Sequence, residues 1–130
     1  MSEKNYICDY IQNSIDAKKK ILDDDNLIDL TEKIAQKIIY AYKNRKKVLF
    51  AGNGGSASDA QHLAAELVGK FSKERIPLNA VALATNVSIL TALGNDYSFE
   101  DIFSRQIEAN GEDGDVFVAI STSGNSKNII

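Results

Sequence analysis

Hydrophobic residues recur at three- and four-residue spacing over the first part of the chain. The two apolar stripes consist of Tyr6, Ile7, Tyr10, Ile11 and Ile15, and of Leu27, Leu30, Ile34, Ile38 and Tyr42. This spacing is typical of α-helices with one apolar face. The polar run 23–26 between the stripes supplies a break and an N-cap for the second helix. Because an apolar helix face needs a partner, we expect the stripes to pack against each other or against a partner subunit.

The pattern changes after residue 47. Short apolar runs at 48–51, 80–83 and 116–120 are typical of strands buried on both faces. Helical patterns follow these strands, at 56–71, 88–93 and 99–109, with a further helix opening at 121–126. Strands that alternate with helices predict right-handed crossovers and a parallel sheet. We therefore expect an α/β fold, a flavodoxin-like doubly wound sheet preceded by two N-terminal helices.

The length of 130 residues suits one domain. We divide it into a helical N-terminal segment, 1–46, and the first three strands of the sheet, 47–130. A sheet whose last covering helix has only begun at Ile130 is incomplete. We expect the C-terminal part of the fold to be missing and the chain to belong to a longer natural protein.

Composition and charge narrow the class of protein. Hydrophobic residues make up 44% and charged residues 25%, as in a globular domain. The formal net charge is −3, and the basic run 18–20 lies near the acidic residues Asp16 and Asp23, which argues against a nucleic-acid partner. The single cysteine fits a reducing compartment, and we find no signal peptide or membrane span. We expect a cytoplasmic protein without a membrane partner.

A glycine-rich loop follows the first predicted strand. It consists of Gly52, Asn53, Gly54, Gly55 and Ser56, and a helix follows it. Small residues let backbone N–H groups approach an anion, and the helix N-terminus favours negative charge. A tight turn that needs glycine for backbone reasons explains the loop equally well. The loop is not a Walker A motif, and the next strand ends without the acidic residue that a nicotinamide dinucleotide requires.

A loop rich in hydroxyl groups follows the third predicted strand. It reads Ser121, Thr122, Ser123, Gly124, Asn125 and Ser126. Four hydroxyl donors without a fixed charge suit a phosphate monoester. Ordinary helix capping explains one such hydroxyl but not four. Two small-residue loops at the carboxyl ends of parallel strands predict a ligand crevice there.

Two further pairs carry candidate chemistry. His62, the single histidine, and Glu66 lie four residues apart on one face of the predicted helix 56–71. Such a pair is able to hold a metal ion, and the carboxylate to act as a general base, although isolated His–Glu pairs also arise by chance. Asn95 and Asp96, in a predicted loop, are either turn formers or ligands of sugar hydroxyl groups.

Taken together, these segments resemble the SIS (sugar isomerase) domain family. The matching residues are 52–56, 59–62, 65–67, 94–96, 103–106 and 121–126. The resemblance covers essentially the whole chain. It is strongest to those members that isomerise a seven-carbon sugar phosphate.

The resemblance implies roles for individual residues. It places the substrate against Asn53, Gly54, Gly55, Ser56, Glu66, Asn95 and Asp96, and the phosphate against Ser121, Thr122, Ser123 and Ser126. It makes Glu66 the catalytic base. It makes His62 and Glu66 ligands of one Zn²⁺ per subunit, whose remaining ligands fall beyond residue 130. We therefore expect residues 1–130 alone to hold zinc poorly and to show little turnover.

The implied reaction converts D-sedoheptulose 7-phosphate to D-glycero-D-manno-heptose 7-phosphate through an enediol. This is the first step toward activated heptose for lipopolysaccharide or capsule, in a homo-oligomer that the family implies to be a tetramer. One position departs from the family pattern, because Lys70 stands where an arginine is common. Lysine lacks the two parallel N–H donors with which an arginine guanidinium binds a phosphate. Two alternatives stay open, a non-catalytic SIS scaffold such as a replication-initiator-binding relative and a sugar-phosphate-binding sensor. Retention of Glu66 favours the enzyme.

Overall fold

The computed structural model describes residues 3–130. The chain divides into two compact units, one ending at Lys37 and the other running from Ile38 to Ile130. Helices α1 (Glu3–Leu22) and α2 (Asp25–Lys43) open the chain, as the two stripes predict, and α2 continues across the boundary between the units. Every candidate site residue lies in the second unit. The division of the domain at residues 46 and 47 stays a prediction.

The second unit alternates strands and helices, which confirms the predicted α/β fold. Its elements are β1 (Val48–Gly52), α3 (Gly55–Val68), β2 (Ala80–Ala82), α4 (Val87–Asp96), the 3-10 helix η1 (Phe99–Asp101), α5 (Ser104–Asn110) and β3 (Val116–Ile120). Within residues 3–130 the strands form one parallel sheet in the order β2-β1-β3. Val48 of the central strand aligns with Ala80 on one side and Val116 on the other.

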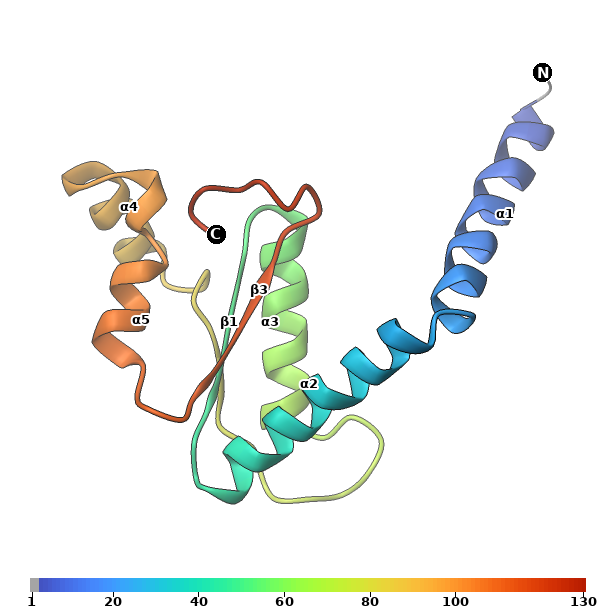
Figure 1. Cartoon of the computed structure of the whole chain (residues 1–130). Coiled ribbons are helices and arrows are strands. Elements are labelled where there is room, and N and C mark those ends of the chain that lie inside the picture. Colours follow the sequence, from blue (N-terminus) through green and yellow to red (C-terminus); the bar gives the residue numbers. More distant parts are fainter. Residues whose placement is uncertain (1–2) are drawn as a thin grey trace. The chain divides into compact units, whose positions relative to one another are not determined.

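Helices cover both faces of this sheet. All five residues of β1 are buried, as expected of a central strand. On one face Val48 and Phe50 pack with Ala60 and Ala64 of α3. On the other face Leu49 and Ala51 pack with residues around η1 and α4, among them Phe103. Figure 1 shows α3 on one side of the strands and α4 and α5 on the other. The alternation of side chains along one strand thus supplies two separate cores.

Several of the expected helices differ from the structure. The helix expected at 56–71 ends at Val68, and the one expected at 99–109 is divided into η1 and α5. The helix expected to open at 121–126 is wrong, because these residues form a loop. Serine hydroxyls in this loop bond to neighbouring backbone N–H groups, from Gly124 to Ser121 and from Asn125 to Ser123. Such local bonds favour a turn over a helix.

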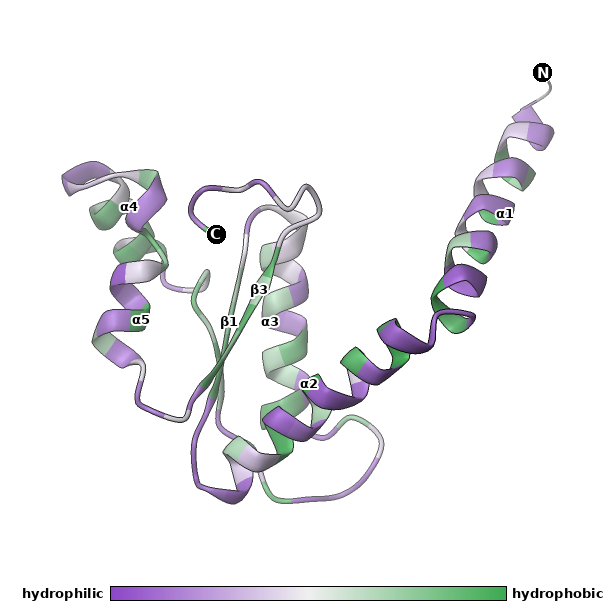
Figure 2. Ribbon diagram, viewed as in Figure 1, coloured by the Kyte–Doolittle hydropathy of each residue, from purple (hydrophilic) through white to green (hydrophobic). Residues whose placement is uncertain are grey.

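The first unit leaves its apolar residues exposed. No residue of α1 is buried, and Tyr10 and Leu22 are each 70% exposed. Figure 2 shows hydrophobic and hydrophilic bands alternating along α1 and α2. The two stripes therefore do not bury each other in the single chain, and the other expected partner, a second subunit, stays a prediction. The end of the second stripe does find a partner, because Ile38 and Tyr42 pack against the core beside α3.

In residues 3–130 there is no helix with the length and apolar character needed to cross a membrane.

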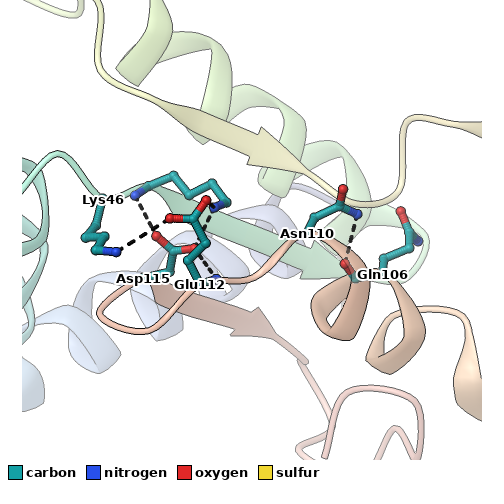
Figure 3. Close-up of polar contacts among 6 residues, drawn as sticks. Lys46, Gln106, Asn110, Glu112 and Asp115 are labelled. Atoms are coloured by element: carbon teal, nitrogen blue, oxygen red, sulfur yellow. Dashed lines mark hydrogen bonds and ion pairs between the residues drawn. The ribbon is translucent and has the colours of Figure 1, made fainter.

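A group of charged residues joins the starts of β1 and β3 (Figure 3). Asp115 accepts hydrogen bonds from the backbone N–H of Lys47 at 2.9 Å and of Glu112 at 2.8 Å, and its carboxylate lies 2.7 Å from the Lys47 ammonium. Burial by itself raises the pKa of Asp115, but these hydrogen bonds outweigh it and hold that pKa below its usual value. The hydrogen bond from the Lys47 ammonium to the Asp115 carboxylate raises the pKa of Lys47. The strands β1 and β3, whose carboxyl ends lead into the two candidate loops, are thus also joined at their amino ends.

Replacing Asp115 with Asn is expected to destabilise the fold by about 2 kcal/mol at neutral pH, because charge-assisted hydrogen bonds are lost. A folded-state pKa below the unfolded value of about 3.9 stabilises the fold above that pH, and the stabilisation is lost as the pH falls through the folded pKa. The gap between wild type and variant should therefore close under acidic conditions. Chemical unfolding at several pH values measures this gap. Asp113→Asn, at an exposed position of the same turn, is the control, and an unchanged gap at low pH would contradict the assignment.

Candidate functional site

The glycine-rich loop lies at the carboxyl end of β1 and leads directly into α3. Gly54 has a φ of 55°, a conformation that glycine adopts without strain, and it stands at the N-cap of α3 without a side-chain cap. Gly54 and Gly55 are exposed, Asn53 is half-buried, and Ser56 is buried. The loop therefore presents backbone rather than side chains beside a helix N-terminus, an arrangement suited to an anion.

The serine-rich loop follows β3, at the same edge of the sheet. The Ser121 hydroxyl lies 3.2 Å from that of Ser126 and 3.5 Å from that of Ser123, so three of the four predicted hydroxyl groups form one cluster. Thr122 and Ser123 are exposed, and Ser121 and Ser126 are half-buried. The turn after the loop is closed by the Ile129 N–H, which donates to the carbonyl of Ser126 at 2.8 Å.

The two loops are joined by a pair of asparagines. The Asn53 amide nitrogen donates to the Asn128 side-chain oxygen at 2.7 Å, and the Asn128 amide nitrogen donates back to Asn53 at 2.9 Å. Asn128 is buried, with 8% of its surface exposed. The two residues lie at opposite ends of the sheet-forming part of the sequence. The two loops thus lie together at one edge of the sheet, as predicted. The pair of hydrogen bonds between Asn53 and Asn128 that joins them was not predicted from the sequence.

A cavity of about 390 Å³ opens beside the glycine-rich loop. Its lining residues are Gly52, Asn53, Gly54, Ala57, Ala84, Leu90, Thr91, Phe99, Ile102 and Phe103. It lies at the carboxyl end of β1, beside one of the two loops that were predicted to form the crevice. Its lining is uncharged and, apart from Asn53, Thr91 and the glycine backbone, apolar. Neither Glu66 nor the serine-rich loop is among these lining residues.

His62 and Glu66 lie on α3, as the sequence predicts. The His62 Nε2 atom is 3.6 Å from a Glu66 carboxylate oxygen, and the two side chains are 72% and 32% exposed. Imidazole nitrogen and carboxylate oxygen are both zinc ligands, so the pair fits one half of a four-coordinate site. Among residues 3–130 no group of three metal-binding side chains is present. The pair alone therefore does not form a complete zinc site.

The end of α3 that carries Glu66 is held by an arginine. Arg75 donates from its guanidinium to the backbone carbonyls of Glu66 at 2.7 Å and of Leu67 at 2.8 Å. Carbonyls at a helix C-terminus lack partners within the helix, and a cation near them is favourable. Arg75 thus stabilises the turn from which the Glu66 side chain projects. Lys70, in contrast, is exposed and pairs with Glu74 at 2.6 Å.

Asn95 and Asp96 lie in a different place from the one expected. They belong to the last turn of α4 and not to a loop after it. Both are exposed, and the Asn95 amide donates to the Asp96 carboxylate at 2.7 Å. The contact with substrate that the resemblance assigns to them stays a prediction.

Two site residues were missed at the level of sequence. A basic residue shortly after a helix end is a recognised capping signal, so Arg75 was open to detection. Asn128 gave no signal, because its partner Asn53 is distant in sequence and asparagine is common in loops.

Residues 9–130 match the family described as SIS domain. The phosphoheptose isomerase of Aneurinibacillus thermoaerophilus is 56% identical over 126 residues, which cover 97% of this chain and 64% of that protein. The phosphoheptose isomerase of Clostridium acetobutylicum gives the same values, 56% identity over 126 residues with 97% and 64% coverage. The chain thus spans 64% of the length of these curated relatives.

Two solved structures have the same fold. The structure of a phosphoheptose isomerase from Neisseria gonorrhoeae aligns with a TM-score of 0.89 at 44% identity, covering 98% of this chain and 65% of that one. The structure from Francisella tularensis aligns with a TM-score of 0.93 at 38% identity, covering 99% and 66%.

Proposed function

The chain belongs to the SIS domain family, and we propose that it serves to isomerise D-sedoheptulose 7-phosphate to D-glycero-D-manno-heptose 7-phosphate. The observation that carries the proposal is the joining of the two anion-suited loops by Asn53 and Asn128, at the start of the helix that bears His62 and Glu66. The high identity to proteins named phosphoheptose isomerase supports this choice of substrate.

The loops divide the work of binding. The hydroxyl groups of Ser121, Thr122, Ser123 and Ser126 hold the phosphate monoester. The glycine-rich loop, Asn53 to Ser56, holds the sugar near the backbone of α3. The 390 Å³ cavity beside this loop is mostly apolar and does not include Glu66, so the polar contacts to the sugar come from the loop and not from the rest of the cavity wall. Asn95 and Asp96 supply further contacts to the sugar.

The chemistry is a proton transfer between neighbouring carbons. Glu66 removes a proton from C1 of the ketose, and the electron pair moves to form the C1–C2 double bond while negative charge develops on the C2 oxygen. Transfer of the C1 hydroxyl proton to the C2 oxygen, together with return of the carbon-bound proton from Glu66 to C2, gives the aldose. A carboxylate is a suitable base because the same group accepts and returns the proton.

His62 and Glu66 are the residues of this chain that would hold a zinc ion. The chemistry that such a metal supplies is stabilisation of negative charge on the enediolate oxygen. Further ligands come from outside the pair.

The wider biology is also part of the proposal, namely a cytoplasmic homotetramer that supplies heptose for lipopolysaccharide or capsule. The exposed apolar stripe of α1 supports association between subunits.

An assay with sedoheptulose 7-phosphate tests the proposal and separates it from a sensor or a scaffold. We would follow the reaction by ¹H NMR in D₂O, for the 130-residue chain and for the protein expressed from its complete reading frame, each with and without zinc. We expect turnover of the phosphate ester, deuterium at C2, and no turnover of unphosphorylated sedoheptulose. Binding without turnover in the complete protein would instead indicate a sensor, and no binding would indicate a scaffold.

Ser123→Ala is expected to weaken phosphate binding about fivefold to tenfold, because one neutral hydrogen bond to the ligand contributes about 1 kcal/mol. Titration with inorganic phosphate measures the change. Ser14→Ala, an exposed serine of α1, is the control and should bind phosphate as the wild type does. Unchanged affinity in Ser123→Ala would reduce the serine-rich loop to a structural turn.

A further inference from the structure

The contact between Asn53 and Asn128 connects two segments that only the fold brings together. Asn53 follows β1, and Asn128 lies in the segment that follows β3 and the serine-rich loop. In Figure 1 this C-terminal segment, drawn in red, returns to the end of β1 at which the chain turns into α3. Asn128 is 8% exposed and Asn53 is half-buried, so the pair is less accessible to water than a surface contact, which strengthens its hydrogen bonds.

The chemistry of the pair is specific to two carboxamides. Each side chain donates one N–H and accepts with one oxygen, so two complementary bonds form without any net charge. An aspartate at either position would keep one bond, lose the other and place negative charge beside an anion site. Serine or alanine would be too short to span the gap. The pair therefore links the loops without repelling a phosphate.

Asn128 is also coupled to the hydroxyl cluster. The turn that positions it begins at Ser126, whose carbonyl accepts from Ile129 at 2.8 Å and from Ile130 at 3.1 Å. The Ser126 hydroxyl in turn contacts that of Ser121 at 3.2 Å. Asn128 is thus linked to the glycine-rich loop by its side chain and to the serine hydroxyl groups by the short turn that begins at Ser126.

We propose that Asn128 is a positioning residue for the sugar-phosphate site, which holds Asn53 and the glycine-rich loop at the separation from the serine-rich loop that a sugar phosphate requires. The inference rests on the proposed function. Because the pair joins the two loops that hold the ligand, and Glu66 contacts neither asparagine, Asn128 governs the affinity for the sugar phosphate and leaves the proton-transfer step unaffected. Replacing Asn128 should therefore weaken the affinity for the sugar phosphate while the rate of proton transfer stays the same.

The test uses the protein expressed from its complete reading frame, with inorganic phosphate and sedoheptulose 7-phosphate as probes. For Asn128→Ala we expect the Kd for phosphate and the KM for the sugar to rise about tenfold, equivalent to one or two neutral hydrogen bonds, with kcat within about twofold of wild type. Asn128→Asp should bind phosphate more weakly than Asn128→Ala because of its charge. Asn110→Ala, which removes a carboxamide bonded to the Gln106 carbonyl at 2.9 Å on α5, is the matched control and should change neither constant.

A double-mutant cycle separates positioning from general destabilisation. If the two amides act as one unit, Asn53→Ala with Asn128→Ala should bind phosphate no more weakly than the weaker single variant. Additive losses, or a phosphate Kd in Asn128→Ala within about twofold of wild type, would overturn the proposal.

Two further readouts keep the test decisive. If the alanine variant does not fold, amide-proton exchange of the wild type decides, because unprotected side-chain amides at Asn53 and Asn128 contradict a lasting pair. Phosphate binding without turnover in the wild type would count against the proposed function alone. A wild type that does not bind phosphate would overturn both proposals.

Discussion

Replacing Glu66 with Gln is expected to lower turnover of sedoheptulose 7-phosphate about a thousandfold, while the affinity for the sugar phosphate changes little. Glutamine has nearly the same size and still accepts a hydrogen bond, but it cannot take a proton from C1, and general-base catalysis is worth about 10²–10⁴-fold. The phosphate contacts lie on the serine-rich loop and not on α3, so binding should survive. Steady-state kinetics combined with titration of the inactive variant measure both quantities.

Glu108→Gln, an exposed position on α5, is the matched control and should be as active as the wild type. A loss of binding as large as the loss of turnover would rule Glu66 out as the base and make it a structural or substrate-orienting group. The exchange of the C1 proton with solvent gives an independent readout. It should stop in Glu66→Gln even at saturating substrate, because no other step removes that proton.

Replacing Gly52 with Ala is expected to give the largest loss of stability, about 3 kcal/mol, together with loss of phosphate binding. A Cβ atom at Gly52 would lie 2.6 Å from the carbonyl carbon of Ser56 and 2.8 Å from its Cβ, and closer still to its carbonyl oxygen. These are mostly backbone atoms of the first turn of α3, so the helix start must move as a whole. Chemical unfolding and phosphate titration measure the two effects.

Gly94→Ala is the control for this substitution. An added Cβ there meets no atom within 4 Å, and Gly94 lies inside α4, so the change should stabilise the protein by about 0.5–1 kcal/mol. Equal stability of the Gly52 and Gly94 variants would show that the approach of α3 to the end of β1 is not constrained. Loss of phosphate binding with unchanged stability would indicate that Gly52 acts on the ligand directly.

The fold followed from the sequence wherever hydrophobic periodicity was strong. The three strands lie where the pattern predicts them, and so does the helix that carries His62 and Glu66, except that it ends at Val68. Predictions failed where polar side chains compete with the backbone for hydrogen bonds. The loop 121–126 was expected to begin a helix, but its serine hydroxyls bond to their own backbone. At the end of α4 the prediction failed in the other direction. Asn95 and Asp96 were expected in a loop, but they belong to the last turn of the helix.

The site divides in a similar way. His62 and Glu66 are four residues apart on a helix, so their proximity follows from local geometry, and the His62 Nε2 atom lies 3.6 Å from the Glu66 carboxylate. The burial of the apolar stripes on α1 and α2 was not decided locally. A stripe indicates that a partner is needed and not which surface provides it, and in the single chain the residues of α1 stay exposed.

The sequence by itself determined the order of strands and helices, the two loops rich in small and hydroxyl-bearing residues, and the helical pair of His62 and Glu66. These features depend on residues within a few positions of one another. Only the tertiary structure decided that Asn128 pairs with Asn53 and that the 390 Å³ cavity lies beside the glycine-rich loop. Contacts between distant segments depend on how the parallel strands align, and no local pattern of side chains records that alignment.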